Sequence, residues 1–259
     1  MIWERFSGGF AALALPDSAA EVMDGIPWGR AEQLFSPAYW AVQAWLVTQN
    51  ERSRRENLGD TLLEEAAACI LGGHGMPAEV GLAAFYHLRA LGLLATDAAY
   101  AATVEELTAA LSGQLSYGGR RFRYRFPNQK ARVLAPVLRG LATNQPDTRN
   151  HLAFRRWFLR FSGVGLKTAS WITRNWLKSD RVAIIDIHIC RAGILAGIFS
   201  FRDRPATQYE KMEQRFLSFC EGIGVPANLV DAIMWRHVRL CSSVADRMLE
   251  HRAATIRIA

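Results

Sequence analysis

Apolar residues recur along most of this chain at the three-to-four-residue spacing of amphipathic helices. The pattern is clear over residues 39–50 and 61–71, and again over residues 81–94 and 103–113, where Thr103 is in position to cap a helix. Nowhere does a sustained apolar-polar alternation between hairpin turns predict an extended sheet. The sequence therefore predicts an all-α protein.

Length and charge narrow the classes of protein that need to be considered. The chain has 259 residues, which is enough for one large domain or two small ones. Half of the residues are apolar and 21% are charged, a balance that excludes disordered, collagen-like and coiled-coil chains. Lys and Arg number 31 against 24 Asp and Glu, so the net charge is +7 and the pI is about 9.6. This excess favours an anionic partner.

The cysteines and the N-terminus predict a protein of a reducing compartment. Cys69, Cys190, Cys220 and Cys241 form no close pair, so zinc ribbons and iron–sulfur loops are excluded and buried thiols are expected. The N-terminus predicts no signal peptide, and no apolar stretch approaches the roughly twenty residues that span a bilayer. We therefore expect a cytoplasmic protein, nucleoid-associated in a bacterium or archaeon, with no membrane partner.

Two helical segments joined by a glycine-rich turn form the most informative motif. An apolar-faced helix ends at Ser162, Gly163-Val164-Gly165 makes a tight turn that a Cβ would obstruct, and residues 166–177 form a second helix. Such a helix-hairpin-helix places backbone N–H groups beside a positive helix end, which suits a phosphate. A turn of this kind is about as often a plain connection, so it does not identify a function by itself.

Two residues with reactive side chains follow at a defined spacing. Lys167 lies at the start of the second helix, and Asp186 comes nineteen residues later, directly before the helical segment IHICRAGIL. An aspartate at this position predicts an N-cap, where the positive end of the helix favours a carboxylate. Capping alone would explain Asp186, but a cap can also take part in catalysis.

This arrangement resembles the helix-hairpin-helix DNA glycosylase superfamily, and in particular its 8-oxoguanine glycosylase branch. The G-V-G-x-K turn and the I-D-x-H segment carry the resemblance, which is clearest from Phe154 to Arg191. Weaker similarity covers the segment from Arg125 to Leu138, around YRFPNQKARVL, and the segment from Leu229 to Trp235, which contains D-x-x-x-W. The absence of a four-cysteine cluster separates the chain from the endonuclease III and adenine-glycosylase branches.

The resemblance implies an HhH-GPD-like fold with two helical lobes and an active site in the interlobe cleft. Residues 45–178 would form the lobe that carries the helix-hairpin-helix, at about 152–178. Residues 1–44 and 179–259 would form the second lobe. We expect Lys167 to belong to the first of these lobes and Asp186 to the second.

The resemblance also assigns roles to individual residues. Lys167 would be the nucleophile that attacks C1′ of the sugar, and Asp186 the carboxylate that stabilises positive charge on that sugar. These two groups suffice for base removal and β-elimination, so no metal or organic cofactor is expected. Phosphate contacts would come from Gly163, Gly165, His188 and Arg125. Contacts with the extruded base or the opposite strand would come from Trp235, Asp231, Asn128 and Gln129.

A loop-like segment at residues 113–128 adds a basic region. It places Arg120, Arg121, Arg123 and Arg125 among aromatic residues. A solvated loop would explain the run, but its position beside Asn128 favours arginines that face DNA phosphates.

The functional expectation is a monomeric DNA glycosylase and AP lyase that excises an oxidised purine, 8-oxoguanine, from double-stranded DNA containing a damaged base. Two other hypotheses stay open. One is a nucleic-acid- or partner-binding accessory protein on the same scaffold, acting on a different modified base or nucleotide. The other is a helix-hairpin-helix module that binds DNA without lesion preference. Release of free base separates the enzyme from both.

Overall fold

The computed structural model describes residues 1–6, 9–49, 57–73 and 75–258. They contain twelve helices and six short strands, so the prediction of an all-α fold class is confirmed. The chain divides into two compact units. Unit 1 comprises Met1–Arg54 and Asp180–Ala259, and unit 2 comprises Arg55–Ser179.

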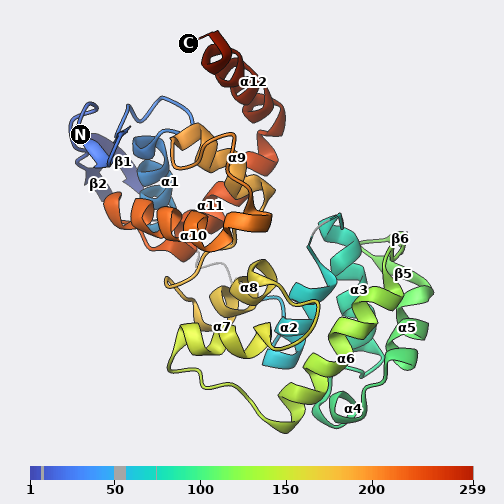
Figure 1. Cartoon of the computed structure of the whole chain (residues 1–259). Helices are drawn as coiled ribbons and strands as arrows, with labels where there is room; N and C mark the ends of the chain where they lie inside the picture. Colours follow the sequence, from blue (N-terminus) through green and yellow to red (C-terminus); the bar gives the residue numbers. More distant parts are fainter. Residues whose placement is uncertain (7–8, 50–56, 74, 259) are drawn as a thin grey trace. The chain divides into compact units, whose positions relative to one another are not determined.

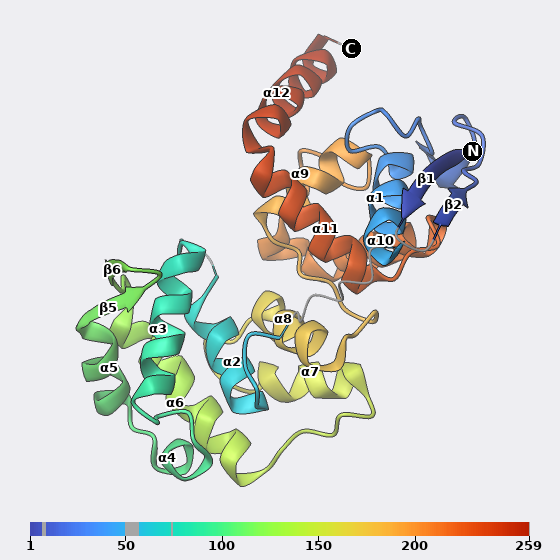
Figure 2. The same cartoon turned by 180° about the vertical axis from the view of Figure 1, so that it is seen from behind.

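Unit 1 is a cluster of helices from both ends of the chain. Its helices are α1 (Pro37–Gln49), α9 (Ile187–Ala196), α10 (Pro205–Gly222), α11 (Ala227–Leu240) and α12 (Ser242–Ile258). Helix α11 packs against α1, α9 and α10, and α12 extends toward the C-terminus (Figure 1 and Figure 2). Large side chains from three of these helices, Trp40, Phe216, Phe219 and Met234, are fully or almost fully buried. Burial of these side chains holds the segment around Asp186 on a packed body.

Short hairpins in the first thirty residues of unit 1 are a departure from the sequence analysis. Strands β1 (Ile2–Phe6) and β2 (Gly9–Leu13) pair antiparallel, as do β3 (Glu21–Met23) and β4 (Ile26–Pro27). Strands of two to five residues are too short to show a sustained alternation, which is why the sequence pattern did not reveal them.

Unit 2 is built around α6. Its helices are α2 (Leu62–Leu71), α3 (Ala78–Ala90), α4 (Thr96–Ala101), α5 (Val104–Ser112), α6 (Pro127–Thr143), α7 (His151–Leu159) and α8 (Leu166–Leu177). Strands β5 (Gln114–Tyr117) and β6 (Arg120–Arg123) form a hairpin before α6. Helix α6 packs against α2, α4 and α5, while α8 packs against α7 and α2 (Figure 1). The predicted cap at Thr103 is confirmed, because its side chain accepts a hydrogen bond from the Glu106 N–H.

A buried carboxylate fixes the position of α8 within unit 2. Glu65 on α2 is 0% exposed, and its Oε1 accepts a hydrogen bond from Asn175 Nδ2 of α8 at 2.6 Å. Its Oε2 accepts the backbone N–H groups of Leu58 at 2.6 Å and Gly59 at 3.0 Å. Because a buried carboxylate is stable only with such partners, this network holds α8, the helix that carries Lys167, against α2.

The cysteines differ in part from expectation. All four are free thiols; Cys69 and Cys220 are buried, but Cys190 is only half-buried and Cys241 is exposed. The prediction of four buried thiols is therefore wrong for Cys241, which lies at the C-cap of α11, where the chain turns at the surface. Over the described residues, no single helix has the length and apolarity to cross a membrane. Helices α10 and α11 meet such a criterion only as a pair bent by 103°.

Candidate functional site

The turn between α7 and α8 depends on one of its two glycines. Gly163 has φ +87°, and a Cβ there would lie 2.4 Å from Cγ2 of Val133 on α6. Gly165 has φ −89°, and a Cβ there would meet no atom within 4 Å. The expectation that a Cβ obstructs this turn therefore holds for Gly163 and is wrong for Gly165, because only the first glycine approaches α6.

We expect Gly163→Ala to destabilise unit 2 by about 2–4 kcal/mol, since it combines an unfavourable positive φ with a steric clash. Gly165→Ala is the matched control and should change the free energy of unfolding by less than about 1 kcal/mol, because its backbone is ordinary and its surroundings are open. Urea unfolding of the two variants measures both effects. Equal stability of the two variants would contradict this account of the turn.

A cavity of about 500 Å³ lies beside this turn. Its walls come from the start of α6 and from the hairpin, namely Asn128, Gln129, Arg132, Val133, Ser162 and Gly163. The structure thus brings together two groups that the sequence analysis treated separately, the Asn128–Gln129 pair and the hairpin glycine. Arg132 was missed, although its position one helical turn after Asn128 on α6 was the available signal.

Lys167 lies in the first turn of α8 and is half-buried. Another lysine of unit 2, Lys130 on α6, donates from Nζ to the backbone oxygens of Ile70 at 2.5 Å and Gly72 at 3.2 Å. Burial, and secondarily the positive charge of Lys167, lowers the pKa of Lys130. Two amines of unit 2 therefore interact electrostatically, one bound to carbonyls at the end of α2 and one at the hairpin.

Asp186 caps α9, as predicted. Its Oδ1 accepts the backbone N–H groups of His188 at 2.8 Å and Ile189 at 2.9 Å. Within the described residues, Oδ2 takes part in no hydrogen bond with another protein group. One carboxylate oxygen thus holds the helix end while the other stays available. Asp186 itself is half-buried.

The extended segment that leads into Asp186 is held by three buried side chains. Glu213 Oε1 accepts the N–H of Ala183 at 3.0 Å, and Asp231 Oδ2 accepts the N–H of Ile184 at 3.2 Å. The Tyr209 hydroxyl donates to the oxygen of Ala183 at 2.8 Å and accepts the N–H of Ile185 at 3.1 Å. These bonds satisfy the backbone of a segment without a strand partner and so fix the approach to α9.

The structure gives Asp231 a different place from the one the sequence analysis assigned. The residue is only 2% exposed and binds the Ile184 backbone, so it does not present its carboxylate to a base edge. Its spacing from Trp235 suggested a shared role, but the two side chains have different contacts: Trp235 is half-buried, with the His188 ring at 5.8 Å and the Arg239 guanidinium at 5.1 Å. The base contact of Trp235 and the phosphate contact of His188 stay predictions.

The residues that the sequence predicted for the site divide between the two units. Unit 2 holds Lys167, Arg125, Asn128, Gln129, Gly163 and Gly165, and unit 1 holds Asp186, His188, Asp231 and Trp235. Arg125 is exposed, with its guanidinium 5.0 Å from the centre of the Phe126 ring.

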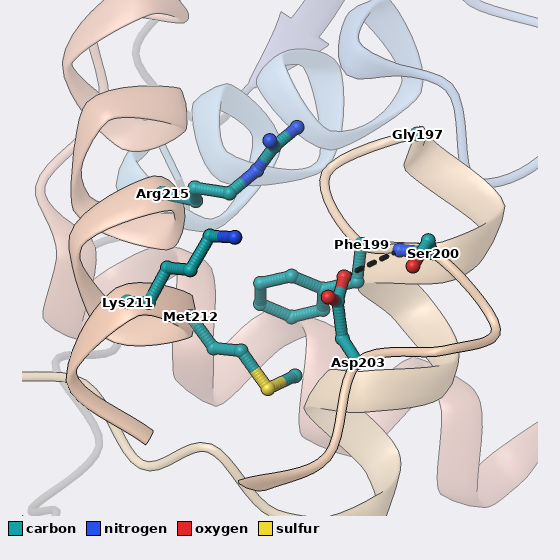
Figure 3. Close-up of a pocket in the computed structure, with 7 residues that line it drawn as sticks. All are labelled: Gly197, Phe199, Ser200, Asp203, Lys211, Met212 and Arg215. Atoms are coloured by element: carbon teal, nitrogen blue, oxygen red, sulfur yellow. Dashed lines mark hydrogen bonds between the residues drawn. The ribbon is translucent and has the colours of Figure 1, made fainter. Parts of the chain in front are cut away.

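A smaller cavity of about 300 Å³ in unit 1 contains none of the predicted residues. Figure 3 shows Lys211 and Arg215 extending from α10 toward the loop of Phe199 and Asp203. Arg215 Nε donates to the oxygen of Ile198 at 2.8 Å, and Asp203 accepts the N–H of Ser200 at 2.7 Å. Because Asp203 and Arg215 already have protein partners and none of the predicted residues lines this cavity, we do not assign it to the candidate site.

The glycine turn between α7 and α8, with a lysine in the next helical turn, defines a helix-hairpin-helix protein. The chain belongs to the 8-oxoguanine DNA glycosylase family (Ogg-HhH), which it matches over residues 47–225. The resemblance that the motifs suggested is therefore confirmed, and DNA is the partner on which this family acts.

Two solved structures have a similar fold. The chain is similar to the 8-oxoguanine DNA glycosylase of Methanocaldococcus jannaschii, with a TM-score of 0.51 and 23% identity over 67% of this chain and 76% of that one. It is also similar to the 8-oxoguanine DNA glycosylase of Thermotoga maritima, with a TM-score of 0.51 and 21% identity over 80% and 90% of the two chains. At these identities the likeness concerns the fold. No curated protein sequence matches the chain.

Proposed function

We propose that the protein excises an oxidised purine, 8-oxoguanine, from duplex DNA and then cuts the strand as an AP lyase. The observation that carries the proposal is the placement of Lys167 in the turn that follows Gly163, in a chain of this family. The available Oδ2 of Asp186 supports it, since the proposed reaction also needs a carboxylate.

In the proposed reaction, the neutral amine of Lys167 attacks C1′ of the damaged nucleoside. The Nζ–C1′ bond forms while the C1′–N9 bond breaks, and the base leaves with the electron pair and takes up a proton. The sugar ring then opens to a Schiff base. Removal of a proton from C2′ expels the 3′ phosphate, and water finally releases Lys167. Asp186 would stabilise the positive charge that develops on the sugar as the base departs.

The turn between α7 and α8 and the cavity beside it would position the DNA. Among the described residues no side chain caps α8, so the N–H groups of its first turn are available to a phosphate oxygen. Asn128, Gln129 and Arg132 line the adjacent cavity and offer amide and guanidinium groups to the strand left opposite the extruded base. We further assign His188 and Arg125 to phosphates and Trp235 to the base.

This function is tested with a panel of duplexes in which one base is altered and is placed opposite each of the four normal bases in turn. We expect free 8-oxoguanine to be released and the same strand to be nicked, while undamaged duplex stays intact. If the base is released but the strand is not nicked, the glycosylase activity is supported and the AP lyase activity is ruled out. If every duplex is bound and none is cut, the protein is an accessory DNA-binding protein and the proposed function fails.

A further inference from the structure

We propose that the β5–β6 hairpin of unit 2 is a second DNA-contacting surface, which binds phosphates of the duplex through Arg121 and Arg123. The hairpin precedes α6 and lines neither of the two cavities described above. The proposal rests on the proposed function only for the identity of the polymer, duplex DNA.

The pleat of the hairpin separates an inner face from an outer one. On the inner face, Leu115 is fully buried and pairs across the strands with Phe122, and the hairpin packs on α3. On the outer face, Ser116 pairs with Arg121 and Gln114 with Arg123, and all four side chains are exposed. The outer face therefore presents polar and cationic groups without an apolar side chain.

The outer arginines have no acidic partner among the described residues. Arg121 donates to Gln114 Oε1 at 3.3 Å, which leaves its charge uncompensated. The surrounding sequence reinforces this, because residues 107–179 contain fourteen Lys and Arg but a single acid, Asp147. The rest of the chain has seventeen Lys and Arg against twenty-three Asp and Glu. The positive charge of the protein is thus concentrated in unit 2, where a polyanion is attracted.

The aromatic rings of the hairpin are occupied by protein partners, which favours phosphates over bases as its ligands. Tyr117 stacks on Tyr86 of α3, with ring centres 5.4 Å apart and planes 6° from parallel. Arg120 lies over the Phe122 ring at 5.5 Å. Binding of unstacked bases needs open aromatic faces, whereas binding of phosphates needs only the outer guanidinium groups.

The spacing of the two arginines fits separate phosphates. Residues two apart on one face of a strand are separated by about 6.6 Å. Along one DNA strand the charges rise by about 3.4 Å each, so Arg121 and Arg123 can reach two different phosphates. A tight turn also holds the two strands, and with them the arginines, in a fixed arrangement. Gly118 and Gly119 close the hairpin with the two positive φ angles that a tight primed turn requires.

The test compares Arg121→Gln/Arg123→Gln with Arg30→Gln/Arg149→Gln. The control double variant removes the same charge from exposed arginines that are already paired, with Glu32 and Asp147 respectively. Dissociation constants for an undamaged duplex are measured between 50 and 200 mM salt. We expect the slope of log affinity against log salt to become shallower by about 1.8 in the hairpin variant, about 0.9 per phosphate. The slope of the control should stay unchanged.

Over this salt range, the affinity of the unmodified protein should therefore fall about tenfold more than that of the hairpin variant. An unchanged slope in a hairpin variant that melts at the normal temperature overturns the proposal, as does an equal loss in the control. The proposal is also overturned if the hairpin variant has a shallower slope for single-stranded DNA but not for the duplex. Because this duplex contains no lesion, the result is independent of excision. If no base is excised from damaged duplexes but the slope of the hairpin variant becomes shallower, the proposed function fails and the DNA contact of the hairpin is supported.

Discussion

Borohydride should trap the unmodified protein covalently on a duplex that contains 8-oxoguanine, and Lys167→Gln should abolish this trapping. Reduction captures the Schiff base between an amine and C1′, so the product disappears with the nucleophile. An amide cannot form the imine, but it keeps a polar side chain that is only one bond shorter than that of lysine. The measurement is the fraction of DNA that migrates as a protein adduct in a denaturing gel.

Lys130→Gln is the control for this experiment, because Lys130 is the lysine whose charge interacts with that of Lys167. Its Nζ is bound to the carbonyls of Ile70 and Gly72, so its loss should lower stability by about 1–3 kcal/mol and leave trapping in place. Trapping by the Lys167→Gln protein would show that the nucleophile is a different amine. Loss of trapping only in Lys130→Gln would assign it to that residue.

Asp186→Asn should lower the rate of base release by about 10²–10³-fold, the size of effect that a lost electrostatic stabiliser produces. Thermal stability should change by less than about 1 kcal/mol, since asparagine caps helices about as well as aspartate and only the charge interaction with the helix end is lost. Single-turnover excision and thermal unfolding, measured on the same preparation, separate the two effects.

Asp186→Ala is the matched variant, because it removes both the charge and the cap. It should release base as slowly as Asp186→Asn and also lose about 1 kcal/mol of stability, as the N–H groups of His188 and Ile189 lose their acceptor. If Asp186→Asn excises at the normal rate, the carboxylate is a structural cap alone. A rate that falls only in Asp186→Ala leads to the same conclusion.

Local features of the sequence predicted the helix-hairpin-helix motif and the start of α9 closely. Helix α8 spans Leu166–Leu177, as its apolar spacing predicted, and Asp186 caps α9. Both features depend on interactions within a few residues, namely helical periodicity and the hydrogen bonds of the first turn. The β5–β6 hairpin was predicted as a loop, although Gly118-Gly119 between short alternating segments was a usable signal for it.

Features that join distant segments were beyond such reasoning. Asp231 was placed at a base by its spacing from Trp235, yet its carboxylate binds the Ile184 backbone, 47 residues away in the chain. Gly163 and Gly165 look equivalent in the motif, but only at the first would a Cβ clash with Val133 of α6. The spacing of Arg132 from Asn128 was a usable local signal, but the position of α6 beside the glycine turn, which brings Arg132 to the cavity, is a tertiary contact.

The amino-acid pattern by itself determined the helices, the lysine after the glycine turn and the aspartate at a helix start, because each depends on neighbours along the chain. The tertiary structure alone decided which carboxylate is turned into the core, at which glycine a Cβ would clash and which arginines stand outward from a hairpin face. Those outcomes depend on the packing of segments that are far apart in sequence, where burial and backbone hydrogen bonding select one arrangement.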